Sequence, residues 1–417
     1  MGGLLKGKSL NNKDITRMKN RLVIILSVAC FASCADNGVI VSEEENGQAI
    51  VNEITVAKGT RADTVADDEE DILTESSFNE NSMLYISQMG TELEPGFDQS
   101  TSKCPLYQYQ WYKNTEATWD TEYNFRPVSG TSPMNWSEIK NYGNVGNAFS
   151  LYAMYFPEDQ KVRFSVEADQ TGGENDQYDT KNFKKSDIMG AYHATSALYT
   201  RPRFRLFHLM VYLRVTIYVP VFNGKTSDDY TKQEFSGFLE GAMQKAIVRN
   251  AKTDFNIEWR ANRSSDTDAP LTQAAENPKQ DIKMYHHKAD ESIIEEIDVT
   301  KYYKNDKLST DKVRKYEFSV LFPAQTFGDN FLYFVLKAPD QSSKYYYFSG
   351  SQIIGESGNY SLTQGTLQHL YLYLPRNTNE TILIGAKILP WNNAVTDMTV
   401  TQDTEQNENN GLTRVLK

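Results

Sequence analysis

Residues 206–219 read LFHLMVYLRVTIYV, and this stretch decides the fold class. One face of it is apolar and consists of Phe207, Leu209, Val211, Leu213, Val215, Ile217 and Val219. The alternating positions carry polar or amphipathic side chains, namely His208, Tyr212, Arg214, Thr216 and Tyr218. Alternation with a period of two over such a length predicts a β-strand that packs one face on a core.

Shorter runs of the same kind follow along the chain. They lie at residues 316–322, 331–336, 345–348, 366–374 and 381–389. Turn-forming residues separate them, as in Gly328-Asp329-Asn330 and Pro375-Arg376-Asn377. Residues 233–249 are predicted to be partly helical, although Gly237 and Gly241 weaken a helix there. Short strands with turns between them predict an all-β protein built from antiparallel sandwiches or barrels.

Length and charge limit the architecture and the partners. A chain of 417 residues is long enough for two or three domains, and we place a boundary after the long strand, between residues 222 and 223. The chain has 43 basic and 55 acidic residues, a net charge of −12. We therefore expect neither sequence-independent binding to nucleic acid nor electrostatic docking on anionic lipid, because both need a concentrated basic surface.

The N-terminal segment has the composition of an export signal. Lys19 and Arg21 precede an apolar run over residues 22–31, and small residues follow it up to Cys34. The run is too short to span a bilayer, and the order of basic, apolar and small residues is that of a secretory signal.

Small residues that end in a cysteine resemble the lipobox of bacterial lipoproteins, in which that cysteine is lipidated and becomes the new N-terminus. Cys34 is the predicted lipidation site, and Cys30, behind Ser27-Val28-Ala29, is the weaker competitor. More than one acyl chain, palmitate among them, would make the outer-membrane anchor stable. Residues 1–33 are then the signal, with residues 1–17 an upstream artefact if translation starts at Met18.

Residues 34–61 form a leader that contains one strand-like island. Residues 49–57 are rich in β-branched side chains and supply the apolar Ile50, Val51, Ile54 and Val56. The next four residues, Lys58-Gly59-Thr60-Arg61, are predicted to be exposed and end in a basic residue. The acidic runs on either side lack the regular ligand spacing and the glycine of an EF-hand loop, so we interpret them as solvated linker.

The sequence contains no recognisable catalytic or metal-binding constellation. His208 and His369 lie within strand patterns, and the neighbours His286 and His287 would point to opposite faces of a strand rather than converge on one ion. There is no phosphate loop, dinucleotide fingerprint, nucleophile elbow or H-E-x-x-H motif, and Cys104 is a lone thiol past Cys34. We therefore expect no enzyme, no cofactor and no metal site.

Four places in the chain resemble the fimbrillin family, the type V pilins and related surface adhesins of the Bacteroidetes. They are the lipobox with its acidic leader; Gly59-Thr60-Arg61-Ala62, which resembles the site where an Arg-specific protease matures these pilins; Ser186-Asp187-Ile188-Met189-Gly190-Ala191 together with the long strand; and Gly385-Ala386-Lys387-Ile388-Leu389-Pro390-Trp391, which is similar to the family's closing strand. The resemblance runs from the lipobox to about residue 400.

The resemblance implies two transthyretin-like β-sandwiches in tandem, residues 62–222 and 223–417, behind the signal and the leader. It implies cleavage between Arg61 and Ala62, which would release the strand at residues 49–57 and leave an apolar groove with unpaired backbone groups. Other pilin subunits would be the partners, because a strand from the next subunit would fill the groove by β-augmentation and build a fibre. The cell surface, and within it the fimbrium, is the implied location, with an outer-membrane lipoprotein as precursor.

The donor strand should come from the segment after Trp391. Its apolar residues are Val395, Met398 and Val400, and they do not alternate cleanly. This pattern fits a tip or accessory subunit better than a shaft subunit.

Two other functions compete with the fimbrial subunit. The first is a monomeric cell-surface lipoprotein that binds glycans through its tyrosine clusters, residues 107–112 and 345–347, with a host or bacterial surface ligand as partner. The second is a secreted hydrolase, for which carboxylates are plentiful but no pair stands out.

Overall fold

The computed structural model divides the chain into two compact units, Met1–Asn46 and Gly47–Lys417. All residues that the structure describes belong to the second unit. The described residues are 50–51, 54–57, 81–87, 106–112, 122–135, 149–157, 164–172, 178–195, 203–222, 237–258, 271–276, 278–288, 290–302, 309–354, 359–376, 378–390 and 398–400.

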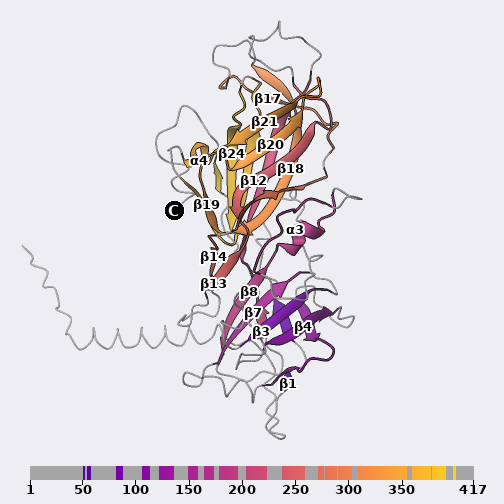
Figure 1. Ribbon diagram of the computed structural model, residues 1–417, viewed down its shortest axis with the longest axis vertical. Helices are drawn as coiled ribbons and strands as arrows, with labels where there is room; N and C mark the ends of the chain where they lie inside the picture. The colour runs from indigo at the N-terminus through magenta and orange to yellow at the C-terminus, as the bar shows by residue number, and fades with distance from the viewer. Residues whose placement is uncertain are drawn as a thin grey trace, which may run out of the picture. The chain divides into compact units, whose positions relative to one another are not determined.

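An eight-stranded sheet gathers the first strands of the chain (Figure 1). Its order is β10-β8-β7-β3-β4-β5-β2-β9. The bounds are β2 (Ile54–Ala57), β3 (Met83–Ser87), β4 (Tyr107–Tyr112), β5 (Glu122–Pro127), β7 (Phe149–Phe156), β8 (Met189–Thr195), β9 (Arg203–Arg205) and β10 (Phe207–His208). A separate two-stranded sheet joins β1 (Ile50–Val51) to β6 (Met134–Asn135).

A seven-stranded sheet contains most of the long strands of the second half of the chain. Its order is β16-β18-β11-β23-β24-β25, with β17 also paired to β18. The bounds are β11 (Met210–Pro220), β16 (Tyr285–His286), β17 (Glu295–Asp298), β18 (Thr310–Pro323), β23 (Thr366–Tyr373), β24 (Ile382–Pro390) and β25 (Met398–Val400). Most neighbours are antiparallel, but β11 and β23 run parallel.

A four-stranded antiparallel sheet of order β15-β12-β20-β21 packs its inner side chains into the same core as the seven-stranded sheet. Its strands are β12 (Met243–Lys252), β15 (Lys279–Lys283), β20 (Leu332–Lys337) and β21 (Ser343–Phe348). Two small pairs complete the sheets, β13 (Phe255–Glu258) with β14 (Leu271–Ala274) and β19 (Gln325–Phe327) with β22 (Tyr360–Leu362). Within the described part of the chain, helix is limited to α3 (Lys181–Lys185) and α4 (Ser351–Ile354). The predicted all-β fold of packed sheets is confirmed.

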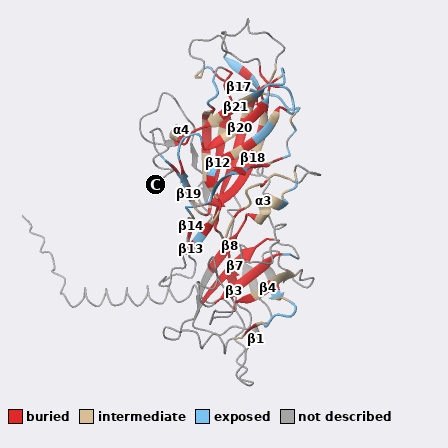
Figure 2. Ribbon diagram, viewed as in Figure 1, coloured by how far each residue is buried: buried red, intermediate tan, exposed pale blue. Residues whose placement is uncertain are grey.

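The core lies between the sheets, and the strands that face it are buried along most of their length (Figure 2). The predicted apolar face of the long strand is its centre, because Val211, Leu213, Val215 and Ile217 are all fully buried. The predicted strands at residues 316–322, 331–336, 345–348, 366–374 and 381–389 all exist, as β18, β20, β21, β23 and β24.

The long strand differs from its prediction in one respect, because the chain changes sheets within it. Phe207 and His208 form β10 and pair with β8 of the eight-stranded sheet. After Leu209, whose N–H donates to the carbonyl of Ile188 at 3.0 Å, β11 enters the seven-stranded sheet. Its partners β18 and β23 both lie beyond residue 222, so the predicted boundary there would divide a sheet, and the domain limits stay a prediction.

The predicted partial helix at residues 233–249 is wrong. Residues 243–252 form strand β12, and the segment before it turns at Gly237 and Gly241. These glycines have φ angles of +102° and +69°, the left-handed region that ends a helix and that glycine adopts most readily. A Cβ at Gly237 would also lie 2.4 Å from the carbonyl oxygen of Val221, so a side chain there would clash with the backbone.

A buried ion pair fastens the end of β11 to the neighbouring strands. The guanidinium of Arg376 bonds both carboxylate oxygens of Asp311, with Nη2 2.6 Å from Oδ1 and Nε 2.9 Å from Oδ2. Tyr373 donates its hydroxyl to the same carboxylate at 2.8 Å, and Arg376 also donates to the carbonyl of Val221 at 3.2 Å. Both charged side chains are almost fully buried, so each needs the other.

Replacing Arg376 with Met should destabilise the fold strongly, because the Asp311 carboxylate would stay buried without its cation. We expect a loss of about 3–5 kcal/mol in the free energy of unfolding, measured by urea denaturation. Lys252→Met is the control, since it breaks an ion pair with the exposed Glu276 and should leave the free energy nearly unchanged. Equal effects of the two substitutions would contradict the role given to the buried pair.

Candidate assembly site

The leader strand β2 lies inside the eight-stranded sheet rather than at its edge. It pairs antiparallel with β5, from Ile54 opposite Phe125 to Ala57 opposite Glu122. On its other side it pairs parallel with β9, where Thr55 lies opposite Arg203. The strand order β5-β2-β9 means that β2 supplies main-chain partners to two strands at once. Without it, both would have an unpaired edge facing the same gap.

Buried apolar residues stand at the register positions next to the leader strands. Phe125, opposite Ile54, and Phe204, opposite Val56, belong to the core cluster of this sheet. Met134 of β6 lies opposite Val51 of β1 and is part of the same cluster. The backbone N–H of Met134 also donates to the hydroxyl of Tyr109 at 2.9 Å. Loss of the leader would therefore remove backbone partners next to an apolar core.

The predicted processing residues lie outside the described part of the chain. These are the lipidation site Cys34 and the cleavage pair Arg61 and Ala62. Of the predicted leader strand, Ile50 and Val51 lie in β1, and Ile54 and Val56 lie in β2, so the structure divides the predicted strand into two and pairs each part with a different neighbour.

The candidate donor segment is placed at the opposite end of the chain, in the seven-stranded sheet. Met398 and Val400 belong to the edge strand β25, which pairs antiparallel with β24. In this pair Val400 lies opposite Ala386, Thr399 opposite Lys387 and Met398 opposite Ile388. Val395 lies outside the described residues. In this structure the segment therefore extends its own sheet as a short edge strand, with its second side unpaired by any described strand.

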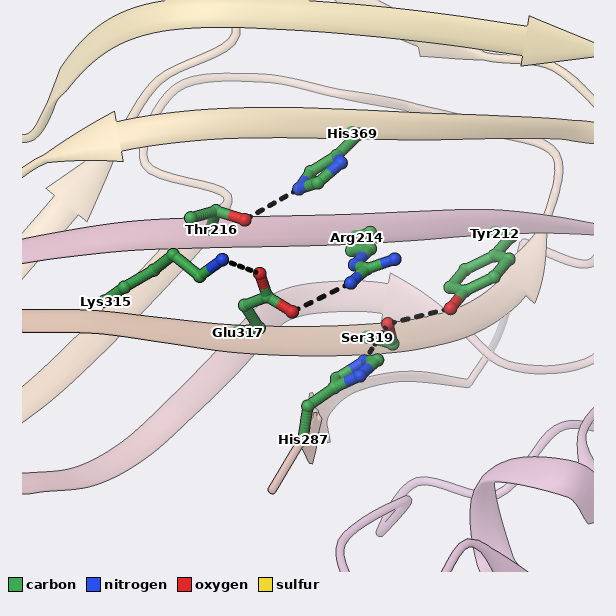
Figure 3. Close-up of polar contacts among 8 residues, drawn as sticks. All are labelled: Tyr212, Arg214, Thr216, His287, Lys315, Glu317, Ser319 and His369. Carbon is green, nitrogen blue, oxygen red and sulfur yellow. Dashed lines mark hydrogen bonds and ion pairs between the residues drawn. The ribbon is translucent and has the colours of Figure 1, made fainter. Parts of the chain in front are cut away.

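A polar cluster on β11 is buried, although it lies on the strand face that alternates with the predicted apolar one. Arg214 donates to Glu317 of β18 at 2.8 Å, and Lys315 contacts the other oxygen of that carboxylate at 2.9 Å (Figure 3). Thr216 bonds His369 of β23 at 2.7 Å. Only 6% of Arg214 and 1% of Thr216 is exposed, so these polar groups lie within the fold and need partners there.

Two further contacts extend the cluster across the sheet. Ser319 donates its hydroxyl to Tyr212 at 3.1 Å and bonds the Nε2 of His287 at 2.6 Å (Figure 3). The ring of His369 stacks on that of Tyr371 with 4.1 Å between centroids. The cluster links β23, β11, β18 and the segment after β16, so its chemistry is that of holding neighbouring strands together. The sequence gives no signal for this cluster, because Arg214 and Thr216 find their partners Glu317 and His369 on strands that are distant in the sequence.

Burial and charge shift two pKa values in this cluster. Burial lowers the pKa of His287 from 6.5 to about 3, and the positive charge of Arg214 acts in the same direction. Burial would raise the pKa of Glu317, but the charge and hydrogen bond of Arg214, together with Lys315, lower it to about 2. At neutral pH the cluster therefore contains a neutral imidazole beside an ionised Arg–Glu pair.

The histidine makes stability depend on pH. The unfolded chain binds a proton at His287 near pH 6.5, whereas the folded chain binds it only near pH 3. The unfolded state therefore holds more protons between these values, and stability should fall as the pH drops from 6.5 towards 3, by up to about 1.4 kcal/mol per pH unit. His287→Gln should flatten the difference in unfolding free energy between pH 6.5 and 5, measured by urea denaturation. An unchanged slope would contradict this.

The other predicted structural residues have packing roles. His208 bonds Asp187 at 2.7 Å, and His286 stacks on Phe318 with 4.7 Å between ring centroids. His286 and His287 thus contact different residues, and no group of three metal-ligating side chains comes together among the described residues. Cys104 lies outside them. No helix in the described part of the chain is long and apolar enough to cross a membrane.

Comparison with solved structures finds bacterial cell adhesion and fimbrial proteins. The chain is similar to a candidate cell adhesion protein from Bacteroides uniformis (13% identity, TM-score 0.40, covering 83% of this chain and 100% of that one). It is similar to another from Bacteroides ovatus (13% identity, TM-score 0.42, 83% and 99%). A third is the tip fimbrial protein Mfa3 from Porphyromonas gingivalis with a C-terminal truncation (8% identity, TM-score 0.33, 81% and 100%).

No protein-family model and no curated protein matches the chain. At these identities and TM-scores the likeness does not show the function, which has to be inferred from the strand arrangement of this chain.

Proposed function

We propose that this protein is a subunit of a surface fimbrium, either in the shaft or as a tip or accessory adhesin, that assembles by strand exchange. It is exported as a lipoprotein through Cys34 and cut after Arg61. The released leader strand is then replaced by a strand from another subunit. The observation that carries the proposal is the interior position of β2 between β5 and β9.

The pairing energetics explain why release of β2 would lead to assembly. Each buried backbone N–H or C=O that loses its partner costs about 1–3 kcal/mol, and β2 bonds strands on both sides. An incoming strand that restores these bonds and covers Phe125 and Phe204 removes that cost. A head-to-tail contact between a groove on one subunit and a strand on the next does not close on itself, so it propagates as a fibre.

The C-terminal segment is the donor in this proposal. The edge strand β25 is short, and three register pairs with β24 hold it. A strand held on one side detaches more easily than one held on both, so Met398 and Val400 are available for a new partner at a lower cost than β2. The uneven spacing of apolar residues around them suits a tip or accessory position.

Cleavage after Arg61 should be required for assembly. We expect Arg61→Ala to leave the exported chain uncleaved by an Arg-specific protease and monomeric, because β2 stays in the sheet. The wild-type chain treated in the same way should lose residues up to Arg61 and form ladders that survive mild detergent. The measurements are N-terminal sequencing and electrophoresis without boiling.

Arg201→Ala is a matched control, because it removes an Arg of the exported chain that lies outside residues 34–61. It should assemble like the wild type. Ladders formed by uncleaved Arg61→Ala protein would contradict release of the leader as the trigger.

Retention of β2 by a disulfide should block assembly without blocking cleavage. Thr55 of β2 lies directly opposite Asn124 of β5, and residues opposite each other in an antiparallel pair are about 4.5–5.5 Å apart at Cα, within the range of a disulfide. In a Cys104→Ser background, Thr55→Cys with Asn124→Cys should give a chain that is cut after Arg61 but keeps its leader. Reduction should then allow ladders to form.

The single variant Thr55→Cys in the same background controls for the substitution itself and should assemble with or without reductant. If the oxidised double variant polymerises as fast as the reduced one, the leader does not have to leave the sheet.

A monomeric glycan-binding protein remains the second candidate. The exposed Tyr345 and its neighbours on the four-stranded sheet favour a binding surface that needs no assembly. Such a surface is compatible with a fimbrial adhesin as well as with a monomer.

A further inference from the structure

The outer face of the four-stranded sheet carries tyrosines and cations. Because register partners share a face, two rows of side chains run across the strands. One row is Lys283, Ile247, Tyr333 and Tyr347, and the other is Lys245, Val335 and Tyr345. The opposite face of β21 is buried, with Tyr346 and Phe348 in the core, so only alternate tyrosines of residues 345–347 reach this outer side. We call this outer side the tyrosine face.

The three outer tyrosines form one contiguous group. Tyr333 is nearly parallel to Tyr345, with ring centroids 5.9 Å apart and an angle of 13° between the planes. Its centroid is 5.1 Å from that of Tyr347. The guanidinium of Arg249 lies 5.6 Å from the centre of the Tyr333 ring. Rings that brace each other lose little conformational freedom when a ligand binds, which favours binding.

Cations stand among the outer tyrosines, although the chain as a whole carries −12. Lys245, Arg249 and Lys337 lie on or beside the tyrosine rows. Lys283, at the end of one row, is already paired with Asp169.

The nearby carboxylates are engaged with their own neighbours. Asp281 accepts a bond from the N–H of Asn250 at 3.1 Å, and Asp340 accepts one from the N–H of Ser342 at 2.9 Å. Glu380 accepts one from the side-chain amide of Gln352 at 3.1 Å. These hydrogen bonds do not remove the charge of the three carboxylates, which flank the face, whereas Lys245, Arg249 and Lys337 stand on or beside its tyrosine rows.

A partner strand is a poor fit for this face. The edge of β21 is closed near Tyr347, whose N–H donates to the carbonyl of Asn379 at 2.9 Å and whose carbonyl accepts from the N–H of Thr381 at 2.8 Å. A large protein partner fits poorly as well, because such interfaces need a buried apolar centre. Among the described large apolar residues that are exposed, which are Leu239, Ile293, Ile294 and Tyr345, only Tyr345 lies on this face.

We propose that the tyrosine face binds an anionic glycan, with Tyr333, Tyr345 and Tyr347 against its sugar rings and Lys245, Arg249 and Lys337 at its carboxylate or sulfate groups. The C–H groups of a pyranose carry partial positive charge and pack on the negative face of a phenol ring. Phenol hydroxyls and guanidinium or ammonium groups supply the hydrogen bonds and charge that an acidic sugar needs.

This site stands independently of strand exchange, because the four-stranded sheet contains neither β2 nor β25. A single flat face should bind weakly, and many copies along a fibre would raise the overall affinity through avidity. The ligand class is therefore testable on the uncleaved chain, where a failure would leave the assembly proposal untouched.

The test is calorimetric titration of the uncleaved exported chain with two hexasaccharides, sulfated chondroitin and neutral cellohexaose. We expect binding to the sulfated probe alone, weakened by added salt. Tyr345→Ala with Tyr347→Ala should weaken it about tenfold or more, and Lys245→Glu with Lys337→Glu should do the same. Circular dichroism should show each variant folded, since these side chains lie outside the core.

Lys288→Glu is the charge-matched control, because Lys288 is exposed and lies outside the four strands of this sheet; it should bind like the wild type. Three results would overturn the proposal: no heat with the sulfated probe at millimolar concentration, equal binding of the neutral probe, or sulfated-probe binding that survives both double substitutions. Self-association of the uncleaved chain that Tyr345→Ala abolishes would show instead that the face binds a second copy, and would equally overturn it.

Discussion

The structure depends on the register of β11 between two long strands. With β18 the pairing runs from Met210 opposite Pro323 to Pro220 opposite Val313. With β23 it runs from Tyr212 opposite Leu367 to Tyr218 opposite Tyr373. A slip of one residue would turn the apolar face away from the core and the Arg214 face into it. The same register therefore fixes both the core around Val215 and the buried cluster that bonds Arg214 to Glu317. Because these strands are far apart in sequence, the pairing has to be settled by the whole domain rather than locally.

The position of β2 sets a second constraint, of the opposite kind. An edge strand can leave a sheet at the cost of its bonds on one side, whereas an interior strand breaks the sheet in two. Because β2 pairs with both β5 and β9, the leader is part of the folded sheet. In the sequence, by contrast, acidic linker segments separate it from the strands that follow. In the proposed assembly this arrangement separates folding from polymerisation, since the groove does not exist until the covalent link is cut.

Alternation in the sequence predicted the strands but not their neighbours. The pattern over residues 206–219 is continuous, so it could not show that the chain changes sheets at Leu209, where the bond to Ile188 intervenes. The alternation predicted that one face of β11 packs on a core, yet Arg214 and Thr216 on the other face are buried too, because Glu317 and His369 form hydrogen bonds with them from distant strands. The leader strand was predicted from its β-branched residues, while its interior place depends on pairing that composition does not encode. Gly237 and Gly241 weaken the predicted helix in the sequence, and their left-handed φ angles in the structure are those of a turn.

The two proposed sites use different parts of the chain's chemistry, and the net charge explains why. Subunits with the same net negative charge repel one another, so electrostatic attraction between whole subunits cannot drive assembly. Short-range terms must do so, and main-chain hydrogen bonds with apolar burial beside Phe125 and Phe204 are of that kind. An anionic ligand meets the same repulsion unless cations stand beside its site, as Lys245 and Arg249 do on the tyrosine face. Because the edge of β21 is closed at Tyr347, strand pairing does not compete for this face. Backbone pairing in one sheet and side-chain recognition on another can therefore vary independently within one subunit.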